Sequence, residues 1–244
     1  MGTEPGAGGG LPLPAVSLSP GERTAPTLGP VARAVYQVLR IAVFALARFW
    51  FRLEVRDGHN IPTTGGFILA PGAHRSNLDT PLLSAVTKRT LRYMGKEGLW
   101  RVPLAAWFLT TLGGFPVQRG LVDREALHRG EEVLGRGEPL VVFPEGTRKR
   151  GPIIDDVKDG AAFLACRTGL PIVPVGMGGT ERALGVGARW IRPTKVVLIV
   201  GEPILPPARE PGGRVKRSQV RQLTETLRDR LQELFDRAQV AAGT

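Results

Sequence analysis

The chain has 244 residues and is 42% hydrophobic, which is enough for a sizeable core and suits one α/β domain. Its 33 Lys and Arg against 22 Asp and Glu give a formal net charge of +11, which favours an anionic partner without choosing among nucleic acid, phospholipid and a phosphorylated substrate. The single cysteine, Cys166, excludes an internal disulfide, and the other ligand types are too scattered for a structural zinc site, so no metal is expected.

The first 30 residues differ in composition from the rest of the chain. They contain seven glycines and six prolines with little apolar periodicity, so we predict a disordered tail over residues 1–30. They lack the basic start and the apolar core of a signal peptide.

Residues 31–52 form a strongly apolar helical stretch. Four arginines punctuate it: Arg33, Arg40, Arg48 and Arg52. Its uninterrupted apolar run, residues 41–47, is much shorter than the roughly 20 residues that span a membrane. Snorkelling arginines and a Phe-Trp-Phe end favour a helix that lies in the interface of an anionic membrane. A core helix of the soluble domain and a tilted or re-entrant insertion are the alternatives.

Residues 53–205 alternate between strand and helix patterns. Strands are expected at 55–61 (an edge strand and turn), 66–70, 91–94, 115–117, 140–143, 172–175 and 196–200, and helices at 79–87, 124–135 and 160–168. Residues 99–112 are too apolar for a solvent-facing helix and are interpreted as ordinary core, or in part as an acyl-chain groove or lipid contact. The pattern predicts a single α/β domain with a mixed, mostly parallel sheet flanked by helices.

The last segment, residues 206–244, combines a proline-rich linker with a charged amphipathic helix over 216–240. The apolar side chains of this helix share one face: Val220, Leu223, Leu227, Leu231, Leu234 and Phe235. Packing on the domain or dimerisation is the expected role.

His74 lies at a predicted turn between a buried strand and a helix, where its ring can point into a cleft. Ser76 and Asp79 have the spacing of a capping box, so we predict that the helix starts at Ser76 with Asp79 in its first turn. An imidazole with an ordinary pKa of about 6.5 accepts protons at neutral pH, and a carboxylate can fix its tautomer and stabilise the imidazolium. His74 and Asp79 are therefore a candidate pair, with a purely capping role for Asp79 as the alternative.

Four blocks of sequence resemble the glycerolipid acyltransferase family, typified by 1-acylglycerol-3-phosphate acyltransferases. They are the His74 to Asp79 pattern, Gly113-Gly114-Phe115-Pro116-Val117-Gln118-Arg119, Phe143-Pro144-Glu145-Gly146-Thr147-Arg148 and Pro171-Ile172-Val173-Pro174-Val175. The blocks follow the family's order and cover roughly residues 50 to 205. Two departures are Ala73, where relatives often carry Asn, and Gln118, where many carry an acid.

The resemblance implies transfer of a fatty acyl group from acyl-CoA or acyl-carrier protein to the free hydroxyl of 1-acyl-glycerol-3-phosphate, giving phosphatidic acid, with no cofactor. His74 would be the general base and Asp79 its orienting carboxylate. Arg119 and Arg148 have planar forks suited to the phosphate.

The remaining site candidates are in the Glu145 loop. Glu145 would hold the acceptor or organise its loop, with Thr147 as a hydrogen-bond partner. Gly146 would let backbone approach the ligand and would offer an N–H to an anion. Lys149, Arg150 and Lys158 would extend the positive charge nearby.

Two alternatives stay open for the function. The acceptor can be another lysophospholipid or glycerol-3-phosphate, or the chain can be a non-catalytic membrane-binding or anion-binding protein. Nucleic acid is not expected, because aromatic residues make up only 6% of the chain and lie mostly inside apolar runs. The expected location is the cytoplasmic face of the cell membrane, as a peripheral or monotopic protein.

Overall fold

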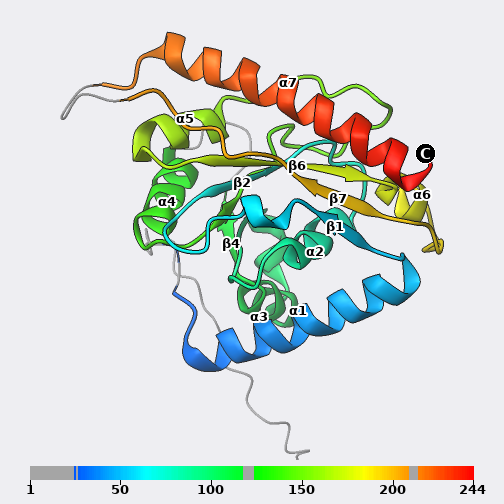
Figure 1. Cartoon of the computed structure of the whole chain (residues 1–244). Coiled ribbons are helices and arrows are strands. Elements are labelled where there is room, and N and C mark those ends of the chain that lie inside the picture. Colours follow the sequence, from blue (N-terminus) through cyan, green and yellow to red (C-terminus); the bar gives the residue numbers. More distant parts are fainter. Residues whose placement is uncertain (1–24, 26, 118–123, 209–213) are drawn as a thin grey trace, which may run out of the picture.

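The computed structural model describes residues 25, 27–117, 124–208 and 214–244 (Figure 1). Most of the predicted disordered tail lies outside these residues. Near its end, Ala25 and Leu28 are buried and the Ala25 N–H donates to Glu132 at 3.1 Å. Pro30 then begins the first helix.

The core of the molecule is a seven-stranded sheet in the order β1-β7-β6-β2-β5-β3-β4. The strands are β1 Glu54–Arg56, β2 Ile68–Pro71, β3 Arg92–Lys96, β4 Gly114–Val117, β5 Leu140–Val141, β6 Ile172–Gly178 and β7 Val197–Val200. All neighbours pair in parallel except β6 and β7, which are antiparallel. The prediction of a single α/β domain with a mostly parallel sheet is confirmed.

Helices cover both faces of the sheet (Figure 1). The α-helices are α1 Pro30–Trp50, α2 Asp79–Leu83, α3 Pro103–Thr111, α4 Arg124–Gly135, α5 Gly160–Thr168, α6 Thr180–Leu184 and α7 Arg217–Ala242, and the short 3-10 helices are η1 Gly58–Asn60, η2 Ser84–Val86 and η3 Glu97–Arg101. The helices α4, α5 and α7 lie on one face, and α1, α2 and α3 lie on the other.

Alternating side chains of the central strand divide the core into two layers. Ile68 and Ala70 join the cluster beneath α4, α5 and α7, whereas Phe67 and Leu69 join the cluster on the face of α1 and α2. This is the period-two pattern of a strand that is buried on both sides. It explains why these strands are continuous apolar runs in the sequence.

The C-terminal helix α7 packs directly on β6. Its predicted apolar face is buried, and two glycines of β6 allow its backbone to approach the strand closely. A Cβ added at Gly176 would lie 2.3 Å from the Leu234 carbonyl oxygen, and one at Gly178 would lie 2.1 Å from the Ala238 carbonyl oxygen.

We expect Gly178→Ala to destabilise the fold, because its methyl group would overlap the α7 backbone. Overpacking of this kind costs about 1–3 kcal/mol, which corresponds to a fall in Tm of roughly 2–12 °C for a chain of this size. The Tm is measured by thermal unfolding, which is monitored by circular dichroism. The control is Gly160→Ala, where no atom lies within 4 Å of the added Cβ. Equal Tm values for the two variants would contradict this account of the packing.

Candidate active site

The carboxyl ends of neighbouring parallel strands bring two of the sequence blocks together. His74 follows β2, and the segment 143–148 follows β5, which pairs with β2. Open α/β sheets bind ligands at this edge. The Lys149 N–H donates to the His74 carbonyl oxygen at 2.9 Å, so the two segments are joined directly.

His74 is held on one side by Asp79 and on one ring face by Phe143. The His74 Nδ1 lies 2.9 Å from the Asp79 Oδ2, and the rings of His74 and Phe143 have centroids 4.2 Å apart. An ionised carboxylate only accepts, so Nδ1 carries the proton and Nε2 keeps its lone pair. The side chain is 17% exposed, and no described residue bonds Nε2. The arrangement suits a general base.

Asp79 is the buried centre of this turn. Its Oδ2 accepts from the backbone N–H groups of Arg75 at 2.9 Å and Ser76 at 2.7 Å, in addition to His74 Nδ1. The α-helix starts at Asp79, three residues later than the predicted start at Ser76. Residues 76–78 form a turn before it, in which the Ser76 hydroxyl accepts the Leu78 N–H and donates to the Leu184 carbonyl oxygen. Asp79 therefore anchors the backbone and orients the histidine at the same time.

Ala73 stands where relatives often carry Asn, and its backbone conformation bears on that difference. Its φ of +57° lies in the left-handed region, which Asn tolerates better than Ala. Ala73 is also fully buried, so an Asn side chain there would need hydrogen-bond partners inside the core.

Arg75 is a site residue that the sequence did not identify. Its side chain is 1% exposed, and its Nη1 lies 3.0 and 3.1 Å from the two carboxylate oxygens of Glu145. Nε donates to the Gly151 carbonyl oxygen and Nη2 to that of Ile153. Nothing in the local pattern marks Arg75 as buried, since its acidic partner is 70 residues away.

Glu145 is turned inward in this structure. It is 2% exposed, and besides Arg75 its Oε2 accepts the His74 N–H at 3.0 Å. Of its two predicted roles, these contacts support loop organisation, and contact with the acceptor stays a prediction. The side chains of Glu145 and Thr147 are not hydrogen-bonded to each other, and the Thr147 N–H donates to the Glu145 carbonyl oxygen.

The rest of the Glu145 loop is exposed. Gly146 has a φ of +68°, which explains the glycine, but its N–H donates to the Phe143 carbonyl oxygen. In this conformation the N–H is therefore already bonded within the loop, and its role as an anion donor stays a prediction. Arg148 is exposed and has no hydrogen bond or ion pair with any residue that the structure describes. Arg119 lies outside the described residues.

The positive charge around the loop is partly offset by acids. Lys149 pairs with Asp155, which raises the pKa of the lysine, and the same contact lowers the pKa of Asp155. Lys158 likewise pairs with Asp156 and lowers its pKa. Of the cations predicted to add charge here, Arg150 donates to the Val186 carbonyl oxygen. Among the described residues, no acid pairs with Arg148 or Arg150, and of the two only Arg148 has a guanidinium without a hydrogen bond.

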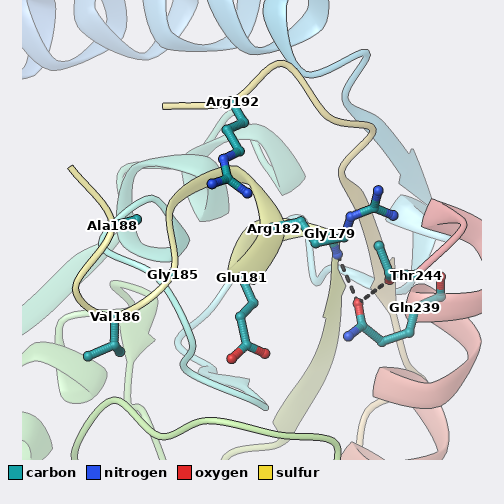
Figure 2. A pocket seen from close by; sticks show the side chains of 9 residues that line it. All are labelled: Gly179, Glu181, Arg182, Gly185, Val186, Ala188, Arg192, Gln239 and Thr244. Atoms are coloured by element: carbon teal, nitrogen blue, oxygen red, sulfur yellow. Dashed lines mark hydrogen bonds between the residues drawn. The ribbon is translucent and has the colours of Figure 1, made fainter. Parts of the chain in front are cut away.

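A cavity of about 360 Å³ lies beyond the carboxyl end of β6, between α6, the segment after it and the end of α7 (Figure 2). Its lining includes Arg182, Arg192 and Gln239 but no residue of 74–79 or 143–148. Gly185 joins the two places, because it lines the cavity and bridges to Ser76. Within the described ranges, no group of three or more His, Cys, Asp or Glu residues could hold a metal ion.

Comparison with known proteins places this geometry in a family. The Acyltransferase family matches residues 52–178, just over half of the chain. The chain belongs to this family. The matched segment contains His74, Asp79 and the Glu145 loop, so the contacts described above are those of an Acyltransferase family member.

Individual relatives agree with the family match. The 1-acyl-sn-glycerol-3-phosphate acyltransferase of Bacillus subtilis is 28% identical over 153 residues, which cover 62% of this chain and 73% of that protein. The chloroplast protein of the same name from Arabidopsis thaliana is 28% identical over 160 residues, or 64% of this chain and 44% of that protein. The chain thus spans about half the length of the plant and algal relatives that it matches.

A solved structure shares the fold. The crystal structure of the 1-acyl-sn-glycerophosphate acyltransferase from Thermotoga maritima gives a TM-score of 0.66 at 27% identity, covering 83% of this chain and 80% of that one.

We expect Arg75→Met and Glu145→Leu each to destabilise the protein strongly, because each leaves its partner charged and buried. The cost of about 3–5 kcal/mol corresponds to a fall in Tm of roughly 6–20 °C. The double variant should recover part of this loss, since neither charge remains. Arg230→Ala, which breaks an exposed pair with Glu233, is the control and should change the free energy of unfolding by less than about 1 kcal/mol. Single variants that melt like wild type would show that the pair does not hold the two loops.

Proposed function

We propose that this chain transfers a fatty acyl group from an acyl thioester to the free hydroxyl of 1-acyl-glycerol-3-phosphate, giving phosphatidic acid. The observation that carries the proposal is the hydrogen bond of 2.9 Å between His74 Nδ1 and Asp79, which leaves Nε2 of a partly exposed histidine as the proton acceptor. The names of the relatives from Bacillus subtilis and Arabidopsis thaliana support the same reaction.

In the proposed reaction His74 acts first as base and then as acid. Nε2 takes the proton of the acceptor hydroxyl while that oxygen attacks the thioester carbonyl carbon. The tetrahedral intermediate then collapses, the carbon–sulfur bond breaks, and the leaving thiolate takes the proton back from the imidazolium. Asp79 stabilises the imidazolium between these steps. General acid–base help of this kind contributes about 10²- to 10⁴-fold in rate.

A direct transfer is proposed, without an acyl-enzyme intermediate. Cys166 is buried in α5, and burial raises the pKa of its thiol, so it is a poor nucleophile. The Ser76 hydroxyl donates to the Leu184 carbonyl oxygen at 2.7 Å and has no contact with His74 Nε2.

Arg148 is the proposed phosphate ligand, together with Arg119. The position of Arg148 supports this role, because the next residue, Lys149, is hydrogen-bonded to the His74 carbonyl oxygen. A phosphate bound there would lie near the histidine that must reach the acceptor hydroxyl of the same small molecule. Gly146 and Thr147, in the same exposed turn, are proposed to border the head group.

One relative supports an alternative acceptor lipid. A lyso-ornithine lipid O-acyltransferase of Pseudomonas aeruginosa is 32% identical over 103 residues. A panel of lysophosphatidate, other lysophospholipids, lyso-ornithine lipid and glycerol-3-phosphate, each offered with acyl-CoA and with acyl-carrier protein, separates the acceptors and the donors.

We also propose that the protein sits on the cytoplasmic face of the cell membrane. By length and composition α1 could cross a membrane, but it is held against the domain, since Tyr36 is buried and its hydroxyl accepts the Leu91 N–H at 3.1 Å. Burial raises the pKa of this hydroxyl. Most of the outer side chains of α1 are exposed, which favours a helix lying in the interface over a core helix.

We expect His74→Ala to lower kcat about 10²- to 10⁴-fold in a protein that still folds, because Asp79 keeps its bonds to the backbone N–H groups of Arg75 and Ser76. Asp79→Asn should also remove most activity and cost about 1–3 kcal/mol of stability, since Asn keeps one acceptor for the two backbone N–H groups. The double variant should be hardly slower than His74→Ala, because the two residues act as a unit. Steady-state kinetics and thermal unfolding measure these effects.

Two results would change this assignment. Near-normal turnover by Asp79→Asn would reduce Asp79 to a backbone anchor, and a folded, active His74→Ala would overturn the mechanism.

We expect Arg148→Ala to raise the KM for the lysophospholipid far more than the KM for the acyl donor. Losing a charge-assisted hydrogen bond of about 1.5–3 kcal/mol predicts a fall in kcat/KM of roughly 10- to 150-fold. Arg230→Ala on α7 is the control and should leave both constants unchanged. Equal effects on the two substrates would assign Arg148 a shared or structural role.

A further inference from the structure

A second exposed apolar surface lies beside α1. It is formed by five side chains of η3, α3 and the residue between them, each between 38% and 61% exposed: Leu99, Val102, Leu104, Trp107 and Phe108. We call these residues the η3–α3 patch. The helix α3 packs against α1, and Figure 1 shows the two next to each other on the same side of the sheet.

The composition of this segment does not suit contact with water. Residues 102–117 contain no charged side chain, and α3 is apolar on all sides, as expected of a buried helix. Yet only Ala106 and Thr111 of α3 are buried. A contiguous exposed apolar surface of this kind marks a site of contact with a partner or a membrane.

The outer face of α1 continues this surface. Its inner side holds the buried Tyr36 and Ala47, while apolar side chains spaced along the opposite side are exposed. Those exposed residues include Val31, Val38, Ile41 and Phe49. Because α1 also packs on α2 and η2, the helix that begins at Asp79 connects this surface to the site.

The charges at the border identify the partner. Neither α1 nor α3 contains an acidic residue, η3 contains one, the exposed Glu97, and exposed arginines at 33, 48, 52 and 101 border the apolar side chains, so positive charge outweighs negative charge there. Anionic lipid head groups complement such a border of arginines. The apolar stems of the arginine side chains can lie along the apolar surface while their guanidinium groups stay at the level of the head groups. Two copies of the chain joined through this surface would instead bring arginines against arginines. The charges therefore favour a lipid surface over a second copy.

The η3–α3 patch begins at the same edge of the sheet as the candidate active site. The helix η3 directly follows β3, which is parallel to β5, and β5 is parallel to β2. The patch therefore starts at the same strand edge that carries His74 and the segment 143–148.

We propose that the η3–α3 patch enters the same lipid leaflet as the outer face of α1, so that a lysolipid can keep its acyl chain in the leaflet while its glycerol reaches His74. This inference rests on the proposed function only for the identity of the substrate. The membrane contact itself can be tested without turnover.

Site-specific labels test the contact directly. Cys166 is the chain's single cysteine and is buried, so a Cys166→Ala background allows labelling of Leu104→Cys, Ile41→Cys and Val240→Cys with an environment-sensitive dye. Val240 is the matched control, because it is 80% exposed but lies on α7, across the sheet. The full-length protein is mixed with vesicles of phosphatidylcholine that contain about one-third phosphatidylglycerol.

We expect blue-shifted emission, and quenching by an acyl-chain-borne quencher, for the labels at 104 and 41 but not at 240. A label at 104 that behaves like the one at 240, while the label at 41 responds, would overturn the proposal. So would a label at 104 that is shielded without vesicles: dependence on protein concentration would indicate a second copy, and independence would indicate cover by another part of the chain.

A paired substitution links the contact to binding strength. The variant Val102→Glu/Leu104→Glu should partition at least about 10-fold more weakly into the same vesicles, because two apolar side chains no longer leave water. Leu205→Glu/Val240→Glu, which places the same charges on exposed apolar positions elsewhere, should partition as wild type. Equal partition of the two variants would contradict the proposal. A wild type that binds vesicles through the patch but acylates no lysolipid would reject the proposed function and keep this inference.

Discussion

The turn at residues 73–76 is fixed by two buried carboxylates, and the candidate site depends on both. Asp79 holds the turn from the α2 side through two backbone N–H groups, and Glu145 holds it from the β5 side through the His74 N–H. Arg75 balances the charge of Glu145 and anchors the segment 151–153. Because both faces of the turn are constrained, the imidazole is aimed before any substrate arrives, which is the condition for efficient general-base catalysis.

The parts predicted from the sequence are those set by local patterns. The helices at Arg124–Gly135 and Gly160–Thr168 were predicted to the residue, because the apolar spacing of each is clear and turn-forming residues bound them. The pairing of His74 with Asp79 was also accessible, since five residues separate them. The Arg75–Glu145 pair was not, because an arginine's burial depends on the packing of loops far apart in sequence. The later start of α2 was missed for a related reason: the Ser76 hydroxyl donates to the Leu184 carbonyl oxygen, which is 108 residues away in the sequence.

The helix α1 shows why sequence alone left three interpretations open. A helix that packs on a domain has an apolar side facing the domain, and a helix that lies in lipid has an apolar side facing the lipid. A helix that does both therefore has two apolar sides and is apolar nearly all round. Composition cannot separate this from a buried or a spanning helix. In the structure, the Tyr36 hydroxyl accepts the Leu91 N–H while the side chains on the opposite side of α1 are exposed, and this supports the proposed interfacial helix.

The proposed membrane contact constrains how the two substrates meet. A lysophospholipid carries its phosphate and its free hydroxyl at the level of the head groups, so His74 and Arg148 must reach that depth and no further. Their places fit this requirement, because both follow strands at the edge where the η3–α3 patch begins, and two strand positions, β2 and β3, separated by β5, carry the histidine and the patch. The acceptor would then approach from the leaflet, and the water-soluble thioester donor from the opposite side of the same histidine. A catalytic residue buried under the patch would meet the lipid's chain but exclude the donor, which accounts for a site at the rim of the apolar surface.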